Sequence, residues 1–180
     1  VFAGRHIPEK RAPALVPALA RARLDAPELR GELYGDGPER GRVLDEIERL
    51  GLGDVVAAPG FVAHAQVEEA LRSALCMVLP SSREGYGLVV VEAAARGTPS
   101  VVVAGEDNAA TELVDDGENG FVAASASPED LAAAILCVRA AGPALRDATA
   151  AWFGRNAARL SLEHSLETVL AAYGQGAARA

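Results

Sequence analysis

The sequence predicts an α/β fold: a Rossmann-like open parallel sheet of about six strands, with helices on both faces. Short apolar runs of strand length alternate with segments of helical periodicity along almost the whole chain. Residues 74–104 can be followed as a complete strand, loop, helix and strand, which is the unit that joins parallel strands. With 180 residues, half of them apolar, the chain is long enough to bury a sizeable core.

The first half of the chain alternates between predicted strands and helices. Residues 1–4 end a short apolar strand, and residues 29–34 and 55–59 form the next two strands. A helix is predicted after each of these strands, over residues 13–24, 38–50 and 65–73. Pro38 suits the first turn of its helix, because the N–H group that proline lacks has no partner there.

The second half begins with the apolar run at residues 74–79, which Pro80 ends because proline cannot donate to a strand ladder. The next apolar residues recur at helical spacing on one face, namely Leu88, Val91, Ala94 and Ala95. Further elements are predicted in order as a strand at 100–104, a short helix at 109–114, a strand at 121–123, and helices at 128–141, 143–159 and 161–173.

Composition excludes several classes of protein. The net charge of −8 argues against a nucleic-acid partner, and no apolar run of 18 residues predicts a transmembrane segment. No signal peptide is recognisable. Cys76 and Cys137 both lie in apolar runs, so we expect two reduced core residues of a cytoplasmic protein rather than a disulfide or a metal pair. Because the sequence starts with Val1 inside a strand, we expect a piece of a longer protein.

The loop at residues 81–87 has the composition of an anion site. It precedes a predicted helix, whose first N–H groups are unpaired and carry partial positive charge, and Gly85 and Gly87 allow an anion to approach the backbone. Glu84 and Glu92 place carboxylates beside it, which suits a ligand that joins phosphate to sugar hydroxyls. The alternative is a structural loop, with Glu84 favoured by the helix dipole and Glu92 on a solvated face.

Residues 80–99, PSSREGYGLVVVEAAARGTP, also resemble a known family. Glu84 and Glu92, with seven residues between them, match the E-x7-E motif of retaining GT-B glycosyltransferases of family 4, the glycosyl transferases group 1. Further matches at residues 60–64 and 115–121 extend the resemblance over nearly the whole chain.

The first loop resembles the same family. Gly4, Arg5 and Lys10 match its pattern G-R-x-x-x-x-K-G, while Arg11 replaces the last glycine. The resemblance implies that Arg5 and Lys10 hold the diphosphate of a nucleotide sugar. A guanidinium and an ammonium suit this role, because they stabilise the negative charge that develops on a departing diphosphate.

The resemblance implies further contacts with the donor. Glu84 is expected to accept hydrogen bonds from hydroxyls of the donor sugar, and Glu92 from the ribose. The distal phosphate and sugar are expected to meet the backbone of Gly85, Tyr86, Gly87 and Leu88, and the base to meet Val62 and His64. No D-x-D motif lies at a suitable loop, so we expect no metal site and no tightly bound cofactor. The expected donor is a UDP- or GDP-linked sugar.

We therefore expect the C-terminal, donor-binding domain of a glycosyltransferase (EC 2.4) that transfers a hexose to an acceptor. Residues 1–160 would form the nucleotide-sugar-binding domain, and residues 161–180 a helix and tail that pack on an N-terminal, acceptor-binding domain. Without that domain, the chain is expected to be inactive. A cytoplasmic location is expected, and a position at the inner face of the membrane stays open.

Three other interpretations remain. A dinucleotide-binding oxidoreductase would require a second glycine in the loop after Gly4, which this chain lacks. A non-catalytic Rossmann-like module would not need Arg5, Lys10, Glu84 and Glu92 together. A related GT-B enzyme, such as a sugar-phosphate synthase or a sugar-nucleotide epimerase, is the third alternative.

Overall fold

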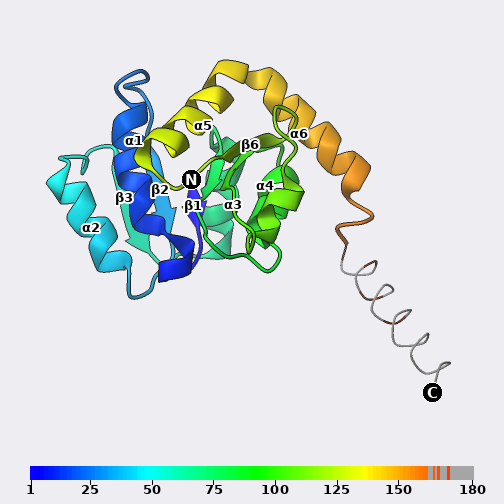
Figure 1. Cartoon of the computed structure of the whole chain (residues 1–180), viewed down its shortest axis with the longest axis horizontal. Coiled ribbons are helices and arrows are strands. Elements are labelled where there is room, and N and C mark those ends of the chain that lie inside the picture. The colour runs from blue at the N-terminus through cyan, green and yellow to red at the C-terminus, as the bar shows by residue number, and fades with distance from the viewer. Residues whose placement is uncertain (162–163, 165, 167–169, 171–180) are drawn as a thin grey trace.

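The computed structural model describes residues 1–161, 164, 166 and 170, and parallel strands form its centre (Figure 1). One three-stranded sheet has the order β1-β2-β3, formed by Phe2–Ala3, Gly31–Tyr34 and Val56–Gly60. The other has the order β4-β5-β6, formed by Met77–Leu79, Ser100–Val103 and Gly120–Ala123. The predicted α/β class with parallel strands is confirmed.

The two sheets meet at β1 and β4. The N–H of Val78 donates to the carbonyl of Val1 at 2.8 Å, and the amino group of Val1 donates to the carbonyl of Cys76 at 2.9 Å. The strands therefore lie in the order β3-β2-β1-β4-β5-β6. The direction in which strands are added reverses between β1 and β4, and ligands of open parallel sheets bind beside such a switch point.

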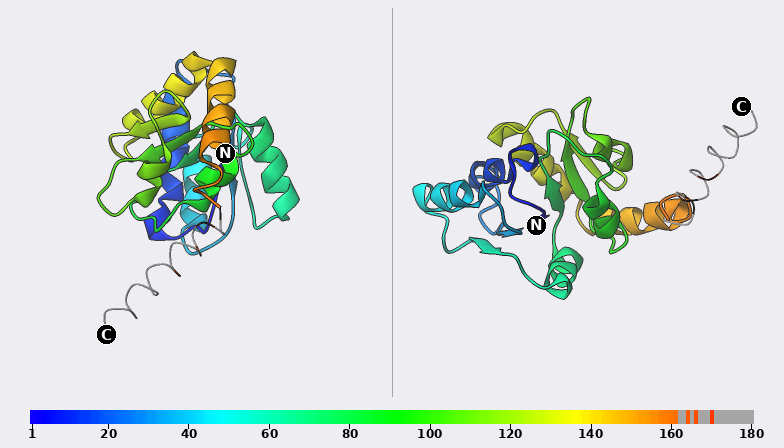
Figure 2. Two further views of the ribbon diagram at one scale, coloured as in Figure 1. Left: turned by 90° about the vertical axis from the view of Figure 1, so that its right-hand side faces the viewer. Right: turned by 90° about the horizontal axis from the view of Figure 1, so that it is seen from below.

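Helices cover both faces of the strands (Figure 2). On one face α1 (Leu15–Ala22) contacts both α2 (Arg40–Arg49) and α5 (Pro128–Ala141). On the other face lie α3 (His64–Ser73), α4 (Leu88–Ala94) and α6 (Pro143–Asn156). Side-chain hydrogen bonds join this second group: Thr98 Oγ1, just after α4, donates to the carbonyl of Leu71 in α3, and Arg146 of α6 donates to the carbonyl of Ala74.

The strands nearest the switch point form the best-buried part of the core. Every residue of β4 and β5 is buried, as expected for parallel strands that are covered by helices on both faces. The loops between elements contain three short 3-10 helices, η1 (Pro8–Lys10), η2 (Ala12–Ala14) and η3 (Ala109–Leu113). The helix predicted at residues 109–114 is therefore a 3-10 helix, and β4 occupies only the end of the predicted strand at 74–79.

Two details of the predicted core are wrong. Of the predicted face, Leu88 is 68% exposed and Ala95 is also exposed, whereas Ala94 is buried as predicted. The helix α4 also buries Val90 and Ala93. This helix is apolar almost all round, so more than one face has helical spacing and the sequence does not show which is buried. Cys137 is exposed although Cys76 is buried, for the same reason in the largely apolar α5. Both cysteines are free.

The helix predicted at residues 161–173 falls mostly outside the described residues. Among the described helices, none combines the length and the apolar character needed to cross a lipid bilayer.

Candidate functional site

The carboxyl ends of β1, β2 and β3 are held together by backbone hydrogen bonds. The N–H of Gly4 donates to the carbonyl of Tyr34 at 3.1 Å, and the N–H of Gly35 donates to that of Gly60 at 2.9 Å. Gly35 has a φ of +117°, and a Cβ atom there would lie 1.9 Å from the carbonyl oxygen of Gly4. Only glycine allows this close approach, so the loops after three strands are fixed side by side at one edge of the sheet.

The loop after β4 is tied to its neighbours in the same way. The N–H of Ser82 donates to the carbonyl of Glu9 in η1 at 2.8 Å. Glu84 exchanges backbone hydrogen bonds with the loop after β5, donating to Asp107 and accepting from Ala109, each at 3.0 Å. The loops after β1, β4 and β5 therefore converge at the switch point.

A charged cluster of Lys10, Glu84 and Ser81 lies where these loops meet. Lys10 Nζ forms an ion pair with Glu84 Oε1, and Ser81 Oγ donates to the same oxygen at 2.8 Å. The Lys10 and Glu84 side chains are only 19% and 8% exposed. Lys10 follows β1 and Glu84 follows β4, so two of the predicted site residues meet at the switch point although 74 positions separate them in sequence.

Two polar residues that support this cluster had no role in the sequence-based prediction. Ser81 is fully buried, and so is Asn108, whose Nδ2 donates to the carbonyls of Ser81 at 3.2 Å and Val103 at 2.7 Å. Asn108 Oδ1 accepts from the N–H of Ala110 at 3.3 Å and thereby caps η3. The signal available in the sequence was an asparagine immediately before a short helix, a preferred capping position.

The glycine loop starts α4 with its first N–H groups free of a side-chain cap. Gly87 is the N-cap, with a φ of +87°, and a Cβ there would lie 2.9 Å from the Cβ of Ala110. Gly85 has open space around its Cβ position. Tyr86 and Leu88 are exposed. The segment 85–88 thus presents backbone and exposed side chains beside the cluster.

Arg5 and Glu92 stand apart from the cluster. Arg5 is exposed, and among the described residues neither its guanidinium nor the half-buried carboxylate of Glu92 takes part in an ion pair or hydrogen bond. The backbone carbonyl of Glu92 accepts from Arg96 Nη1 at 2.7 Å. In the part of the chain that the structure describes, no opposite charge therefore contacts either group.

The segment after β3 is also separate. His64 is exposed at the first position of α3, and its Nε2 lies 3.7 Å from Glu68 Oε1 of the same helix. Glu68 in turn pairs with Arg96 at the end of α4. Val62 is half-buried, while the preceding Phe61 is 88% exposed. The structure does not bring His64 to the Lys10–Glu84 pair.

Asp36, at the end of β2, has a local role. Its Oδ1 accepts from the N–H of Gly37 at 2.7 Å, which is a turn interaction. Within the described residues, no group of three or more His, Cys, Asp or Glu side chains lies close enough to hold a metal ion.

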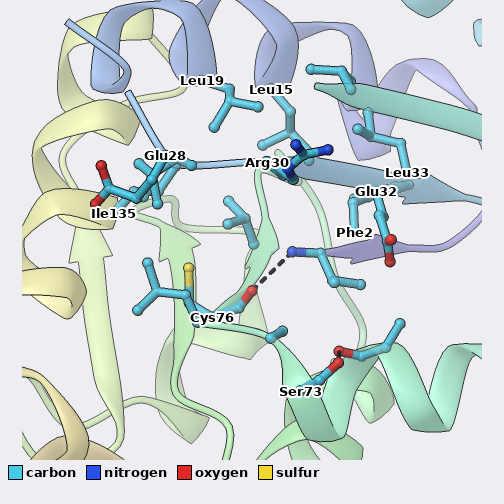
Figure 3. Close-up of a pocket in the computed structure, with 18 residues that line it drawn as sticks. Phe2, Leu15, Leu19, Glu28, Arg30, Glu32, Leu33, Ser73, Cys76 and Ile135 are labelled. Atoms are coloured by element: carbon cyan, nitrogen blue, oxygen red, sulfur yellow. Dashed lines mark hydrogen bonds between the residues drawn. The ribbon is translucent and has the colours of Figure 1, made fainter. Parts of the chain in front are cut away.

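A cavity of about 350 Å³ opens at the amino ends of the strands, opposite the carboxyl ends where the charged cluster lies (Figure 3). Its lining includes the first residues of the strands, such as Gly31 and Val56, together with Val1 and Cys76, which share the hydrogen bond drawn in the figure. None of the candidate residues lines it. Ligands of parallel sheets bind at the carboxyl ends of strands, so the charged edge is the better candidate.

Similarities to known proteins identify the family and the fold of this chain. Residues 1–148 match the profile of the family described as glycosyl transferases group 1. A D-inositol 3-phosphate glycosyltransferase of Geodermatophilus obscurus is 35% identical over 185 aligned residues, which cover 96% of this chain but 39% of that protein. The chain thus spans less than half the length of this relative.

Solved structures share the fold. Anabaena HepE in complex with UDP-glucose is 28% identical, with a TM-score of 0.72, covering 86% of this chain and 43% of HepE. The same protein with UDP superposes with a TM-score of 0.81 at 24% identity. A sucrose-phosphate synthase from Thermosynechococcus elongatus is 28% identical, with a TM-score of 0.73, over 95% of this chain and 45% of that one. The chain has the GT-B Rossmann-like fold and belongs to the glycosyl transferases group 1 family.

Proposed function

We propose that this chain is the donor-binding domain of a retaining glycosyltransferase of family 4, which transfers a hexose from a nucleoside-diphosphate sugar to an acceptor. The observation that carries the proposal is the Lys10–Glu84–Ser81 cluster at the switch point between β1 and β4. It places a cation and a carboxylate beside the loop 85–88. Together these groups match a ligand that joins a diphosphate to a sugar.

The diphosphate would lie against Lys10, Arg5 and the N–H groups at the start of α4. Lys10 is the only lysine in the sequence, and its charge is now shared with Glu84. A diphosphate that approached this pair would be attracted by Lys10 and repelled by Glu84. Arg5 lies on the same loop, has no ion-pair partner among the described residues, and would supply the additional attraction. As the bond to the sugar breaks, both cations would stabilise the charge on the leaving diphosphate.

The sugar would lie against Glu84. Oε1 of this carboxylate accepts from Lys10 and Ser81, whereas Oε2 has no hydrogen-bond partner in the described part of the chain. Oε2 is thus available to a sugar hydroxyl. We assign Glu92 to the ribose hydroxyls, and Val62 and His64 to the base. The support for a uridine nucleotide is that HepE, 28% identical, was solved with UDP-glucose.

The acceptor site would belong to another domain. The matched relative is more than twice as long as this chain, and we propose that residues 161–180 pack on an acceptor-binding domain of the whole protein. By itself the chain would bind the donor and transfer nothing. The sucrose-phosphate synthase neighbour keeps a sugar-phosphate synthase as a second candidate, which would use the same kind of donor.

The single lysine allows a direct test. Reductive methylation with ¹³C-formaldehyde labels only Lys10 and the terminal amine, keeps the positive charge, and gives one lysine NMR signal. We expect UDP and UDP-glucose to shift that signal, and GDP to shift it only if the base is not discriminated. Isothermal titration of the unlabelled chain supplies the affinities.

Glu84→Gln and Glu129→Gln form a matched pair for this test. Glu129 is an exposed acid in the first turn of α5 and serves as the control. Glu84→Gln frees the charge of Lys10, so UDP should bind at least as tightly while the additional affinity for the sugar of UDP-glucose is lost. If no nucleotide binds to the folded chain or moves the Lys10 signal, the non-catalytic module becomes the better interpretation.

A further inference from the structure

His6, in the loop between Arg5 and Lys10, is fully buried without a hydrogen bond from its ring. Its exposed fraction is 0%, and within residues 1–161 neither Nδ1 nor Nε2 has a partner at hydrogen-bond geometry; a backbone influence on the ring comes from Tyr34. A neutral imidazole always carries one N–H donor, and burying a donor without an acceptor costs free energy. An apolar residue of similar size would avoid this cost, so packing alone does not explain a histidine here.

The surroundings of His6 explain how it can hold its loop. Its ring packs edge-on against Phe2, with the ring centroids 5.6 Å apart. The backbone N–H of His6 donates to the carbonyl of Asp36 at 2.9 Å, and the backbone carbonyl of His6 accepts from the N–H of Glu39 at 2.8 Å. A Cβ at Gly37 would lie 2.6 Å from that carbonyl oxygen. His6 therefore fastens the loop that bears Arg5 and Lys10 to the β2–α2 loop.

The buried position of His6 disfavours protonation of its ring. Burial lowers the pKa of His6, and the guanidinium of Arg40 at the start of α2 lowers it further, while the Asp36 carboxylate and a backbone interaction with Tyr34 oppose these effects. The Asp36 carboxylate is exposed and already accepts a hydrogen bond from Gly37. The Tyr34 hydroxyl donates to Glu32, and burial raises the pKa of Tyr34 to about 12, so it stays neutral.

We propose that His6 is a positioning residue of the donor site. Its neutral ring keeps the loop that carries Arg5 and Lys10 in the observed position, the locked form, and its protonation releases the loop into an unlocked form. The proposal rests on the donor-binding function above. It adds that donor affinity falls in mildly acidic solution through a residue that does not touch the donor.

The sign of the effect follows from proton linkage. An exposed histidine has a pKa of about 6.5, and the locked loop holds His6 with a lower value. The unlocked loop therefore binds the proton more tightly. The locked form is fully favoured above about pH 6.5 and loses its advantage as the pH falls below that value towards the pKa of the locked form.

The test compares the affinity for UDP-glucose at pH 7.5, 6.5 and 5.5 in the wild-type chain and in His6→Leu. The diphosphate diester of UDP-glucose does not titrate in this range, so it contributes no pH dependence of its own. We expect wild-type affinity to fall by up to about tenfold at pH 5.5, because this pH lies about one unit below the pKa of about 6.5 of an exposed histidine. In His6→Leu the affinity should be flat. His164→Gln, at an exposed histidine that has no part in the proposed donor site, is the control and should keep the wild-type profile.

A second readout separates this proposal from the proposed function. The ¹³C-dimethyl signal of Lys10 without ligand should shift between pH 7.5 and 5.5 in the wild type and stay fixed in His6→Leu, because unlocking the loop breaks the pair with Glu84. If the Lys10 signal shifts with pH in the wild type only but no nucleotide binds, the donor-binding function is wrong and the role of His6 in holding the loop is supported. Identical pH profiles of the wild type and His6→Leu would contradict the role of His6. Should His6→Leu fail to fold, His6→Met serves as the neutral variant.

Discussion

The loop after β4 and the loop after β3 both contain predicted site residues, yet they are built differently. Glu84 in the first is held by backbone hydrogen bonds to the loop after β5, by Ser81 and by Lys10. His64, the first residue of α3 directly after the second loop, is exposed and contacts only Glu68 of its own helix within the described residues. The Glu84 carboxylate, which two side chains hold on a backbone tied to the next loop, is already oriented for a ligand, whereas an exposed side chain must be ordered by the ligand at an entropic cost.

The largest loss of unfolding free energy is expected for Asn108→Ala, which removes hydrogen bonds that hold the loop after β4. The change removes three hydrogen bonds from a fully buried side chain and leaves the carbonyls of Ser81 and Val103 without this donor. We expect a loss of about 3 kcal/mol of unfolding free energy, measured by urea denaturation, since each unsatisfied buried group costs about 1–3 kcal/mol. His64→Ala, directly after the other loop, should stay within about 0.5 kcal/mol. Equal losses in the two variants would contradict the difference between the loops.

Lys10→Ala should have the next largest effect, on binding. It removes the cation that the diphosphate is proposed to contact, and hydrogen bonds to charged groups contribute about 1.5–3 kcal/mol. We expect UDP affinity to fall about 10-fold to 100-fold in isothermal titration, since 1.4 kcal/mol is a factor of ten. Arg83→Ala, an exposed cation in the loop after β4, is the control. If both variants lose the same affinity, the attraction comes from general charge and not from the cluster.

Two glycines of the loop after β4 should differ in how much stability is lost on substitution by alanine, which Gly87→Ala and Gly85→Ala compare. Gly87 is in the left-handed region and would bring a Cβ to 2.9 Å from Ala110, so alanine should cost about 2 kcal/mol of stability. Gly85 has free space and should tolerate alanine within about 0.5 kcal/mol. Urea denaturation measures both. A fall in UDP affinity for Gly85→Ala, without loss of stability, would support close approach of the phosphate there.

The sequence predicted the parts of this site that local pattern determines. The alternation of strands and helices is enough to predict the parallel fold and the edge at which the loops meet. Lys10 and Glu84 stand in motifs, so both could be named before their contact was known. The E-x7-E spacing predicted Glu92 on the helix that follows the glycine loop, where α4 places it.

The rest depended on tertiary contacts. Asn108 and Ser81 are ordinary loop residues in the sequence, and only the meeting of three loops buries them. The buried face of α4 was assigned incorrectly because Leu88 and Val90 are equally apolar, and only the position of the sheet distinguishes them. His6 lay between two predicted phosphate ligands, yet nothing local indicated that its ring would be fully buried.

Arg11→Gly should give the smallest effect, and one of opposite sign. The resemblance places a glycine at this position, and Arg11 is the non-glycine residue with a positive φ, +49°, among those described. The left-handed conformation costs a residue with a Cβ about 1–2 kcal/mol, whereas glycine gives back about 0.5–1 kcal/mol through the entropy of the unfolded chain. The net gain should be about 0.5–1 kcal/mol, or about 2 °C in the thermal midpoint of a chain of this length.

Arg42→Gly supplies the control for this change, because Arg42 is another exposed arginine, paired with Glu39, that lies inside α2 in the right-handed region. There glycine relieves no strain and should lower stability by about 1 kcal/mol. Opposite shifts of the two midpoints would show that strain at Arg11, and not loss of charge, determines the result. If both fall, the side chain of Arg11 contributes more than its backbone costs. The loop after β1 would then depend on a contact of Arg11, as the loop after β4 depends on Asn108.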